Sequence, residues 1–149
     1  MKSLHLKVIR RLFITIGIGL WLIILPSPLL AQNVALLLYD SETGRDFVGC
    51  LNCNRYASES VCNKYGDYGS RYSTQSIWNR YGKFGSRYNT NSPWNRYGKG
   101  LKIVDTNGNY YGLFSISQHG KSTVPLVQLL LETYKKNDDL DILRDLLCK

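Results

Sequence analysis

The chain has 149 residues and a formal net charge of +8, from 19 Lys and Arg residues against 11 Asp and Glu. A length of this size suits one domain once a short processing segment is removed. Two histidines and four cysteines supply few soft metal ligands, which argues against a zinc site.

The first thirty-one residues have the pattern of a signal peptide. The uncharged apolar run Leu12–Leu25 is shorter than the roughly 20 residues that a membrane-spanning helix needs. We therefore expect export with cleavage near Ala31, which leaves Gln32–Lys149 as a single domain without a transmembrane span. An uncleaved membrane anchor is the alternative. Basic residues precede the apolar run: Lys2, Lys7, Arg10 and Arg11.

The segment 32–52 has the pattern of a β-hairpin. Two apolar runs enclose a turn-prone stretch that begins at Asp40 and includes Gly44. The segment 101–117 repeats this arrangement around Asp105, and its Asn107-Gly108 pair is a strong hairpin signal. The two hairpins therefore resemble each other, and their four strands can pair into one antiparallel sheet.

Three tandem copies of a 16-residue unit separate the hairpins, at Cys53–Tyr68, Gly69–Phe84 and Gly85–Gly100. Their sequences are CNRYASESVCNKYGDY, GSRYSTQSIWNRYGKF and GSRYNTNSPWNRYGKG. Glycine beside aromatic residues predicts compact turns. Because aliphatic residues are scarce, we expect Trp and Tyr stacking between copies to stabilise the array. The aromatic rows are Tyr56/Tyr72/Tyr88, Tyr65/Tyr81/Tyr97 and Cys62/Trp78/Trp94.

The segment 122–149 is predicted to be helical. Ser122 or Thr123 can provide a cap, Pro125 fits a first turn, and leucines recur at helical spacing. The predicted fold class is therefore α+β. It combines a small antiparallel sheet from two related hairpins, an aromatic turn-repeat insert, and C-terminal amphipathic helices packed on the sheet.

Four cysteines in an exported chain favour disulfides, for which three connectivities exist. Cys53 replaces a Gly and Cys62 replaces a Trp of the other copies. Because both changes occur in the same copy, we expect them to compensate each other through a Cys53–Cys62 bond. Cys50 would then pair with Cys148. A Cys50–Cys53 bond is disfavoured if the chain there is extended, because the Cα atoms would lie about 10 Å apart.

The unit resembles the S-x-x-S-I-W-N-x-Y-G-x-Y-G-S-x-Y arrays of small exported bacterial proteins of uncharacterised activity. The resemblance covers Asp40–Ser115. It implies a bacterial exported protein and assigns no site residues.

Motifs for catalysis are absent: the exported part holds one histidine, His119, and no nucleophile or metalloprotease signature. We therefore expect no enzyme, cofactor or metal. The array instead suits a polymer such as a cell-wall glycan or another anionic envelope polymer. Its rings would stack on sugars, its amides would bind hydroxyls and its arginines would bind anionic groups. The candidate residues are Trp78, Trp94, Tyr81, Tyr97, Asn79, Asn95, Arg71 and Arg87.

Two alternatives accompany this hypothesis. The same rings can form the core of the array, in which case the protein is a structural or oligomerisation module of the envelope without a specific ligand. Nucleic acid suits the array chemically, since arginine and aromatic residues alternate. Export makes nucleic acid the poorer candidate.

Overall fold

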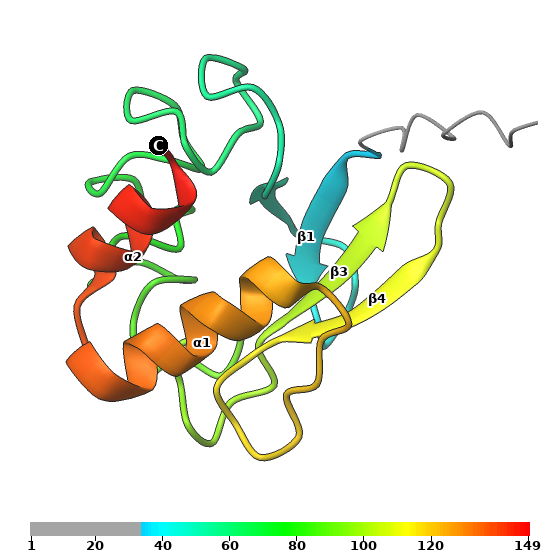
Figure 1. Cartoon of the computed structure of the whole chain (residues 1–149), viewed down its shortest axis with the longest axis vertical. Coiled ribbons are helices and arrows are strands. Elements are labelled where there is room, and N and C mark those ends of the chain that lie inside the picture. The colour runs from blue at the N-terminus through cyan, green and yellow to red at the C-terminus, as the bar shows by residue number, and fades with distance from the viewer. Residues whose placement is uncertain (1–33) are drawn as a thin grey trace, which may run out of the picture. The chain divides into compact units, whose positions relative to one another are not determined.

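The computed structural model describes residues 34–149, so the predicted signal peptide lies outside the described residues. Four strands form one sheet in the order β2-β1-β3-β4, and every neighbouring pair is antiparallel (Figure 1). Two helices follow at the C-terminus. The predicted α+β class, with two hairpins in one antiparallel sheet, is confirmed. The elements are β1 (Leu36–Asp40), β2 (Phe47–Cys50), β3 (Leu101–Asp105), β4 (Tyr110–Phe114), α1 (Pro125–Asn137) and α2 (Leu140–Leu147).

Each hairpin turns around a buried aspartate at the end of its first strand. The carboxylate of Asp40 accepts hydrogen bonds from the backbone N–H groups of Thr43 at 2.7 Å and Asp46 at 2.9 Å. The carboxylate of Asp105 accepts from the N–H groups of Asn107 at 2.8 Å and Asn109 at 2.9 Å. The two hairpins thus share one turning device, in which an aspartate satisfies the donors of its loop.

The repeat array is attached to the sheet at both ends. In the first copy, Cys50 of β2 donates its N–H to Glu59 O at 2.7 Å and accepts from Val61 N at 3.0 Å. In the last copy, Pro93 O accepts from Ile116 N, just beyond β4, at 2.9 Å. The array therefore closes against the sheet as part of the same fold.

Sheet, array and helices share one hydrophobic core. The sequence predicted helices packed on the sheet, whereas in the structure Trp94 of the array contacts both β4 and α1. The ring of Trp94 lies 5.2 Å from Phe114 of β4 and 4.8 Å from Tyr134 of α1, measured between centroids. Fully buried members of the core include Leu38, Val61, Ile77, Phe84, Trp94, Ile103, Phe114, Val127, Leu130 and Leu143.

Aspartates control the junction between the two helices. Asp138 ends α1 in the left-handed region at φ 52°, and the Asp139 side chain caps α2 by accepting from the N–H of Asp141 at 2.8 Å. The predicted side-chain cap of α1 is wrong. The hydroxyl of Ser122 accepts instead from Val124 N at 3.1 Å, before the helix begins.

We predict that Asp40→Asn destabilises the protein at neutral pH and weakens its acid sensitivity. Burial raises the pKa of the Asp40 carboxyl, but hydrogen bonds from Thr43, Asp46 and Arg45 outweigh burial and hold it well below its usual range. A carboxyl with a lowered folded pKa stabilises the protein above its unfolded pKa, and this stability is lost as the pH falls. The expected loss for the variant is about 1–3 kcal/mol at pH 7.

Urea unfolding at pH 7 and pH 3 measures this effect. The wild type should lose more stability than Asp40→Asn between the two pH values. Asp67→Asn, at an exposed position of the array, is the control that should behave as wild type. An identical pH dependence in wild type and Asp40→Asn would contradict the assignment.

Candidate functional site

Buried tryptophans join successive copies of the array. The indole N–H of Trp78 donates to Val61 O at 2.6 Å, and that of Trp94 donates to Ile77 O at 2.7 Å. The two rings lie 6.1 Å apart and are only 3% and 1% exposed. The prediction that these two rings stack on a ligand is therefore wrong, since other side chains cover them. They belong to the core, as the alternative interpretation held.

The asparagine that the three copies share forms its side-chain hydrogen bonds within the array. Asn79 donates from Nδ2 to Ser73 O at 3.1 Å, while its Oδ1 accepts from Tyr81 N at 3.0 Å. Asn95 makes the matching bonds in the last copy, at 3.1 Å to Asn89 O and 2.9 Å from Tyr97 N. These amides fix the turns, so the predicted role of Asn79 and Asn95 in binding ligand hydroxyls is not supported.

Six tyrosines, two in each copy, are almost fully exposed. Tyr81 and Tyr97, both predicted site residues, are 96% exposed, and the other four are 82–87% exposed. Within residues 34–149, none of these six rings packs on another aromatic ring. The predicted stacking of tyrosines between copies is therefore wrong, and these rings are exposed to solvent. The six are Tyr56, Tyr65, Tyr72, Tyr81, Tyr88 and Tyr97.

A basic residue precedes each of these tyrosines. In the first copy, the Arg55 guanidinium lies 5.7 Å from the Tyr56 ring centroid, and the Lys64 ammonium lies 4.9 Å from that of Tyr65. Asn63 joins the two segments, because its amide bonds to Tyr56 O at 3.4 Å and to Tyr65 N at 3.1 Å. We call the six tyrosines and their preceding basic residues the tyrosine–arginine face. The basic residues are Arg55, Lys64, Arg71, Arg80, Arg87 and Arg96.

The central arginines of this face are paired with acidic residues at the α1–α2 junction. Arg71 lies 2.9 Å from the Asp141 carboxylate, Arg80 donates to Asp138 O at 2.9 Å, and Arg87 pairs with the Asp138 carboxylate. The predicted residues Arg71 and Arg87 are therefore partly neutralised, although their side chains remain 45% and 44% exposed.

The cations at the two ends of the face differ from the central ones. Among residues 34–149, Arg55, Lys64 and Arg96 form no ion pair. These three residues were not among the predicted anion-binding side chains. Alignment of the copies could have identified them. Arg55 aligns with the predicted residues Arg71 and Arg87, and Lys64 and Arg96 align with Arg80.

The disulfides are Cys50–Cys53 and Cys62–Cys148, with Cα–Cα distances of 5.5 Å and 5.3 Å. All four cysteines form disulfides as expected, but the predicted Cys53–Cys62 and Cys50–Cys148 pairs are wrong. The strand ends at Cys50 and the chain bends at once, so the extended geometry assumed for Cys50–Cys53 does not occur.

The two cysteines of the first copy mark the absence of a preceding copy. A Cβ at Gly69 or Gly85 would lie 2.3 Å or 2.1 Å from the carbonyl oxygen of an asparagine in the copy before. The first copy has no such neighbour, so Cys53 fits where the others need glycine. Cys62 occupies the position that holds Trp78 and Trp94 in the later copies, and it bonds Cys148 instead of contacting an earlier copy.

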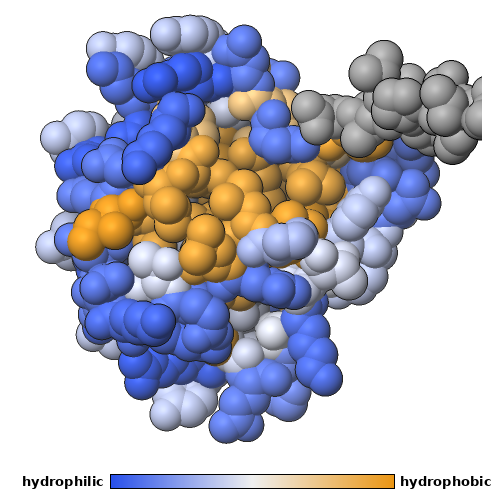
Figure 2. Space-filling view, in the orientation of Figure 1, coloured by the Kyte–Doolittle hydropathy of each residue, from blue (hydrophilic) through white to orange (hydrophobic). Residues whose placement is uncertain are grey.

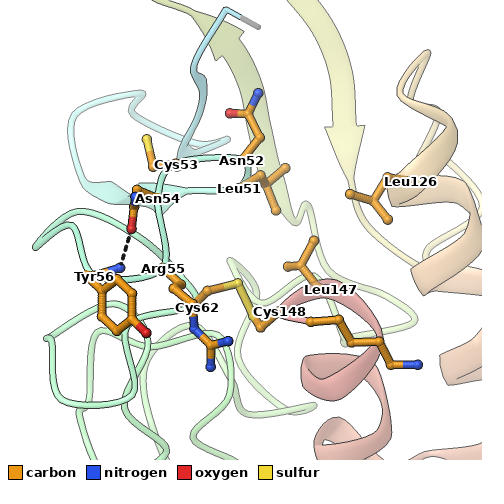
Figure 3. Close-up of a pocket in the computed structure, with 11 residues that line it drawn as sticks. Leu51, Asn52, Cys53, Asn54, Arg55, Tyr56, Cys62, Leu126, Leu147 and Cys148 are labelled. Carbon is orange, nitrogen blue, oxygen red and sulfur yellow. Dashed lines mark hydrogen bonds between the residues drawn. A yellow bond between two sulfur atoms is a disulfide. The ribbon is translucent and has the colours of Figure 1, made fainter.

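A groove of about 410 Å³ lies at the start of the array (Figure 3). Its floor contains Leu51, Leu126 and Leu147 beside the Cys62–Cys148 disulfide, and Arg55 and Tyr56 also line it. Figure 2 shows an apolar area on the helical side of the molecule, bordered by hydrophilic residues. Exposed apolar side chains on the helices include Leu126, Leu129 and Ile142.

Within residues 34–149, no group of His, Cys, Asp and Glu side chains could hold a metal ion. The same part of the chain contains no helix with the length and apolarity required to cross a bilayer. Two disulfides are consistent with a location in an oxidising compartment outside the cytoplasm. No protein-family model, curated protein or solved structure matches the chain significantly.

We predict that the Cys62→Ser/Cys148→Ser variant is less stable than wild type by about 4 kcal/mol, because this bond closes a long loop in the unfolded chain. Cys50→Ser/Cys53→Ser should cost less, since only three positions separate its cysteines. Denaturant unfolding measures both losses. A non-reducing peptide map that showed a Cys50–Cys148 link would contradict the observed connectivity.

A second prediction separates core rings from surface rings. Trp94→Ala should lower the free energy of unfolding by about 3–5 kcal/mol, because it removes a buried ring and its hydrogen bond. Tyr97→Ala, three residues later and 96% exposed, should change it by less than about 0.5 kcal/mol. Thermal or denaturant unfolding compares the two, and comparable losses would mean that Tyr97 also supports the fold.

Proposed function

We propose that this protein is a non-catalytic component of the cell envelope that binds an envelope polymer, such as a cell-wall glycan, through its tyrosine–arginine face. One observation carries the proposal. The exposed tyrosines of the face are identical in all three copies and each follows an Arg or Lys, whereas several buried residues change.

The buried ninth residue of the copies is Val61, Ile77 and Pro93 in turn. Other surface positions have also diverged, as Asp67 in the first copy corresponds to Lys83 in the second. The exposed tyrosines, by contrast, are identical at both positions of every copy, and the residue before each is always Arg or Lys. Folding does not require an exposed ring, so retention of these side chains favours a role in contact with another molecule.

The geometry of the face suits a repeating ligand. An exposed tyrosine ring offers an apolar surface to the C–H groups of a sugar, and the half-exposed basic group before it donates hydrogen bonds to hydroxyl groups. One such contact is weak. Three similar copies on one rigid array engage a polymer several times, and the combined affinity then exceeds that of a single contact.

The location belongs to the same proposal. The basic start and short apolar run before Ala31 favour cleavage and export. The disulfides and the resemblance of the array to those of exported bacterial proteins support an envelope site. The bound polymer would then be one that the exported protein meets there.

A structural role is the second candidate, and the ion pairs of the array favour it. Lys83 pairs with Asp46, and Lys99 lies 3.0 Å from the Glu42 carboxylate, both in the β1–β2 loop. Together with the pairs at the α1–α2 junction, these contacts use positive charge of the array to hold the fold together. In that case the face would serve as a spacer or an oligomerisation surface.

Co-sedimentation with purified cell-wall sacculi at low and moderate salt tests the proposal. We expect the exported protein to pellet at both salt concentrations, and Tyr81→Ala/Tyr97→Ala to bind roughly tenfold more weakly. Tyr110→Ala, an exposed tyrosine outside the array at 60% exposure, is the matched control and should bind as wild type.

Salt separates the two candidate functions. Retention that moderate salt abolishes equally in wild type and variants would indicate general charge attraction rather than recognition by rings. Failure of every protein to pellet would leave the structural role as the better account.

A further inference from the structure

The last copy of the array opens into a basic groove. The groove measures about 620 Å³ and lies between the array, the loop that follows β4, and α1. Arg96 and Tyr97 of the tyrosine–arginine face line one side, and Lys121 and Lys135 line the rest together with neutral residues. No acidic side chain is among these lining residues, and Glu132 pairs with only one of the three cations, so the lining carries a net positive charge.

The polar groups of this groove are poorly compensated within residues 34–149. Arg96 and Lys121 form no ion pair there, and Lys135 shares its charge with Glu132 at 2.8 Å. Ser117 is 8% exposed and accepts a hydrogen bond from the Ser115 hydroxyl at 3.0 Å. Because a hydroxyl rotates, Ser117 can turn its hydrogen either to Ser115 Oγ or to an acceptor in the groove.

The loop that forms the floor is held in place. Gly120 approaches the end of β4 so closely that a Cβ there would lie 2.0 Å from Ser115 O. Its N–H donates to Ser117 O at 2.9 Å. These contacts hold the backbone of the loop in place, which reduces the ordering that ligand binding would require.

We propose that this groove binds an acidic substituent, a carboxylate or a phosphate, of the polymer that contacts the tyrosine–arginine face. The inference rests on the proposed function and specifies its ligand as an acidic polymer. Tyr97 belongs both to the face and to the groove, so a polymer that contacts Tyr97 also lies next to the groove.

The ion pairs along the face explain why we place the anion site at the last copy. In the middle, Asp138 and Asp141 already occupy Arg87 and Arg71, so a ligand anion gains little there. At the start, Arg55 and Lys149 share their groove with Leu51, Leu126 and Leu147, beside which burial of a ligand charge is costly. The groove at the last copy is lined by three cations, and two of them, Arg96 and Lys121, form no ion pair within residues 34–149.

Calorimetry with a galacturonate oligomer and its neutral methyl ester, at constant ionic strength, tests the inference. We expect the exported protein to bind the acid roughly tenfold more tightly than the ester, as for a charge-assisted hydrogen bond. Lys121→Gln should remove most of this preference while leaving affinity for the ester unchanged. Lys136→Gln makes the same charge change on α1 outside the groove and should retain the preference.

A second measurement separates failure of the groove from failure of the proposed function. Backbone NMR shifts of residues 117–121 are followed while inorganic phosphate or free galacturonate is added. Shifts that Lys121→Gln abolishes, and Lys136→Gln does not, support an anion site even if no polymer binds, and their relative size distinguishes phosphate from carboxylate.

The opposite pattern overturns the inference. Equal affinity for acid and ester, lost in Tyr81→Ala/Tyr97→Ala, would support polymer binding by the face and reject the groove. Absence of phosphate and galacturonate shifts in residues 117–121 would reject the groove independently of the face.

Discussion

The hydrogen bond from a buried indole to the carbonyl of the preceding copy is the contact on which the array depends. It occurs twice, from Trp78 to Val61 and from Trp94 to Ile77, in places where water cannot compete. The third carbonyl in this series, that of Pro93, accepts instead from Ile116 next to the sheet. The same contact thus sets the spacing between copies and joins the array to the rest of the fold.

The two ends of the array follow from this arrangement. The first copy has no copy before it, and there a cysteine replaces the tryptophan and bonds Cys148 at the end of α2. The last copy ends at Gly100, directly before β3, where the backbone passes close to Phe114. Gly100 has a φ of 69°, and a Cβ there would lie 2.5 Å from Phe114 O. Cys53 and Cys62 replace Gly and Trp in the same copy, but they do not bond each other. Each forms a disulfide with a cysteine outside the array.

With the tryptophans inside, each copy leaves its tyrosines and most of its cations outside. The body supplies acidic residues against the middle of this surface, through Asp138 and Asp141, and against its lysines through Glu42 and Asp46. Cations without partners in the described part of the chain remain towards the ends. The fold therefore fixes both the rigid spacing of the rings and the places where positive charge stays available.

Local sequence patterns predicted the secondary structure well. The aspartate-centred hairpins, the helical tail beginning at Pro125 and the periodic array all depend on residues close in the chain, and each pattern has a direct physical cause. The candidate site was predicted only in part. Tyr81 and Tyr97 are exposed as a binding role requires, while Trp78 and Trp94 are buried.

The sequence by itself determined the number of copies, their period and the types of side chain that recur. It could not decide which aromatic row faces the core, because Trp and Tyr both recur at the same interval of 16 residues. Only the tertiary structure decided that, since the body covers one side of the array and solvent the other. It likewise decided the partners of Cys62, Arg71 and Arg87, which lie in the C-terminal segment and are set by packing across the whole domain.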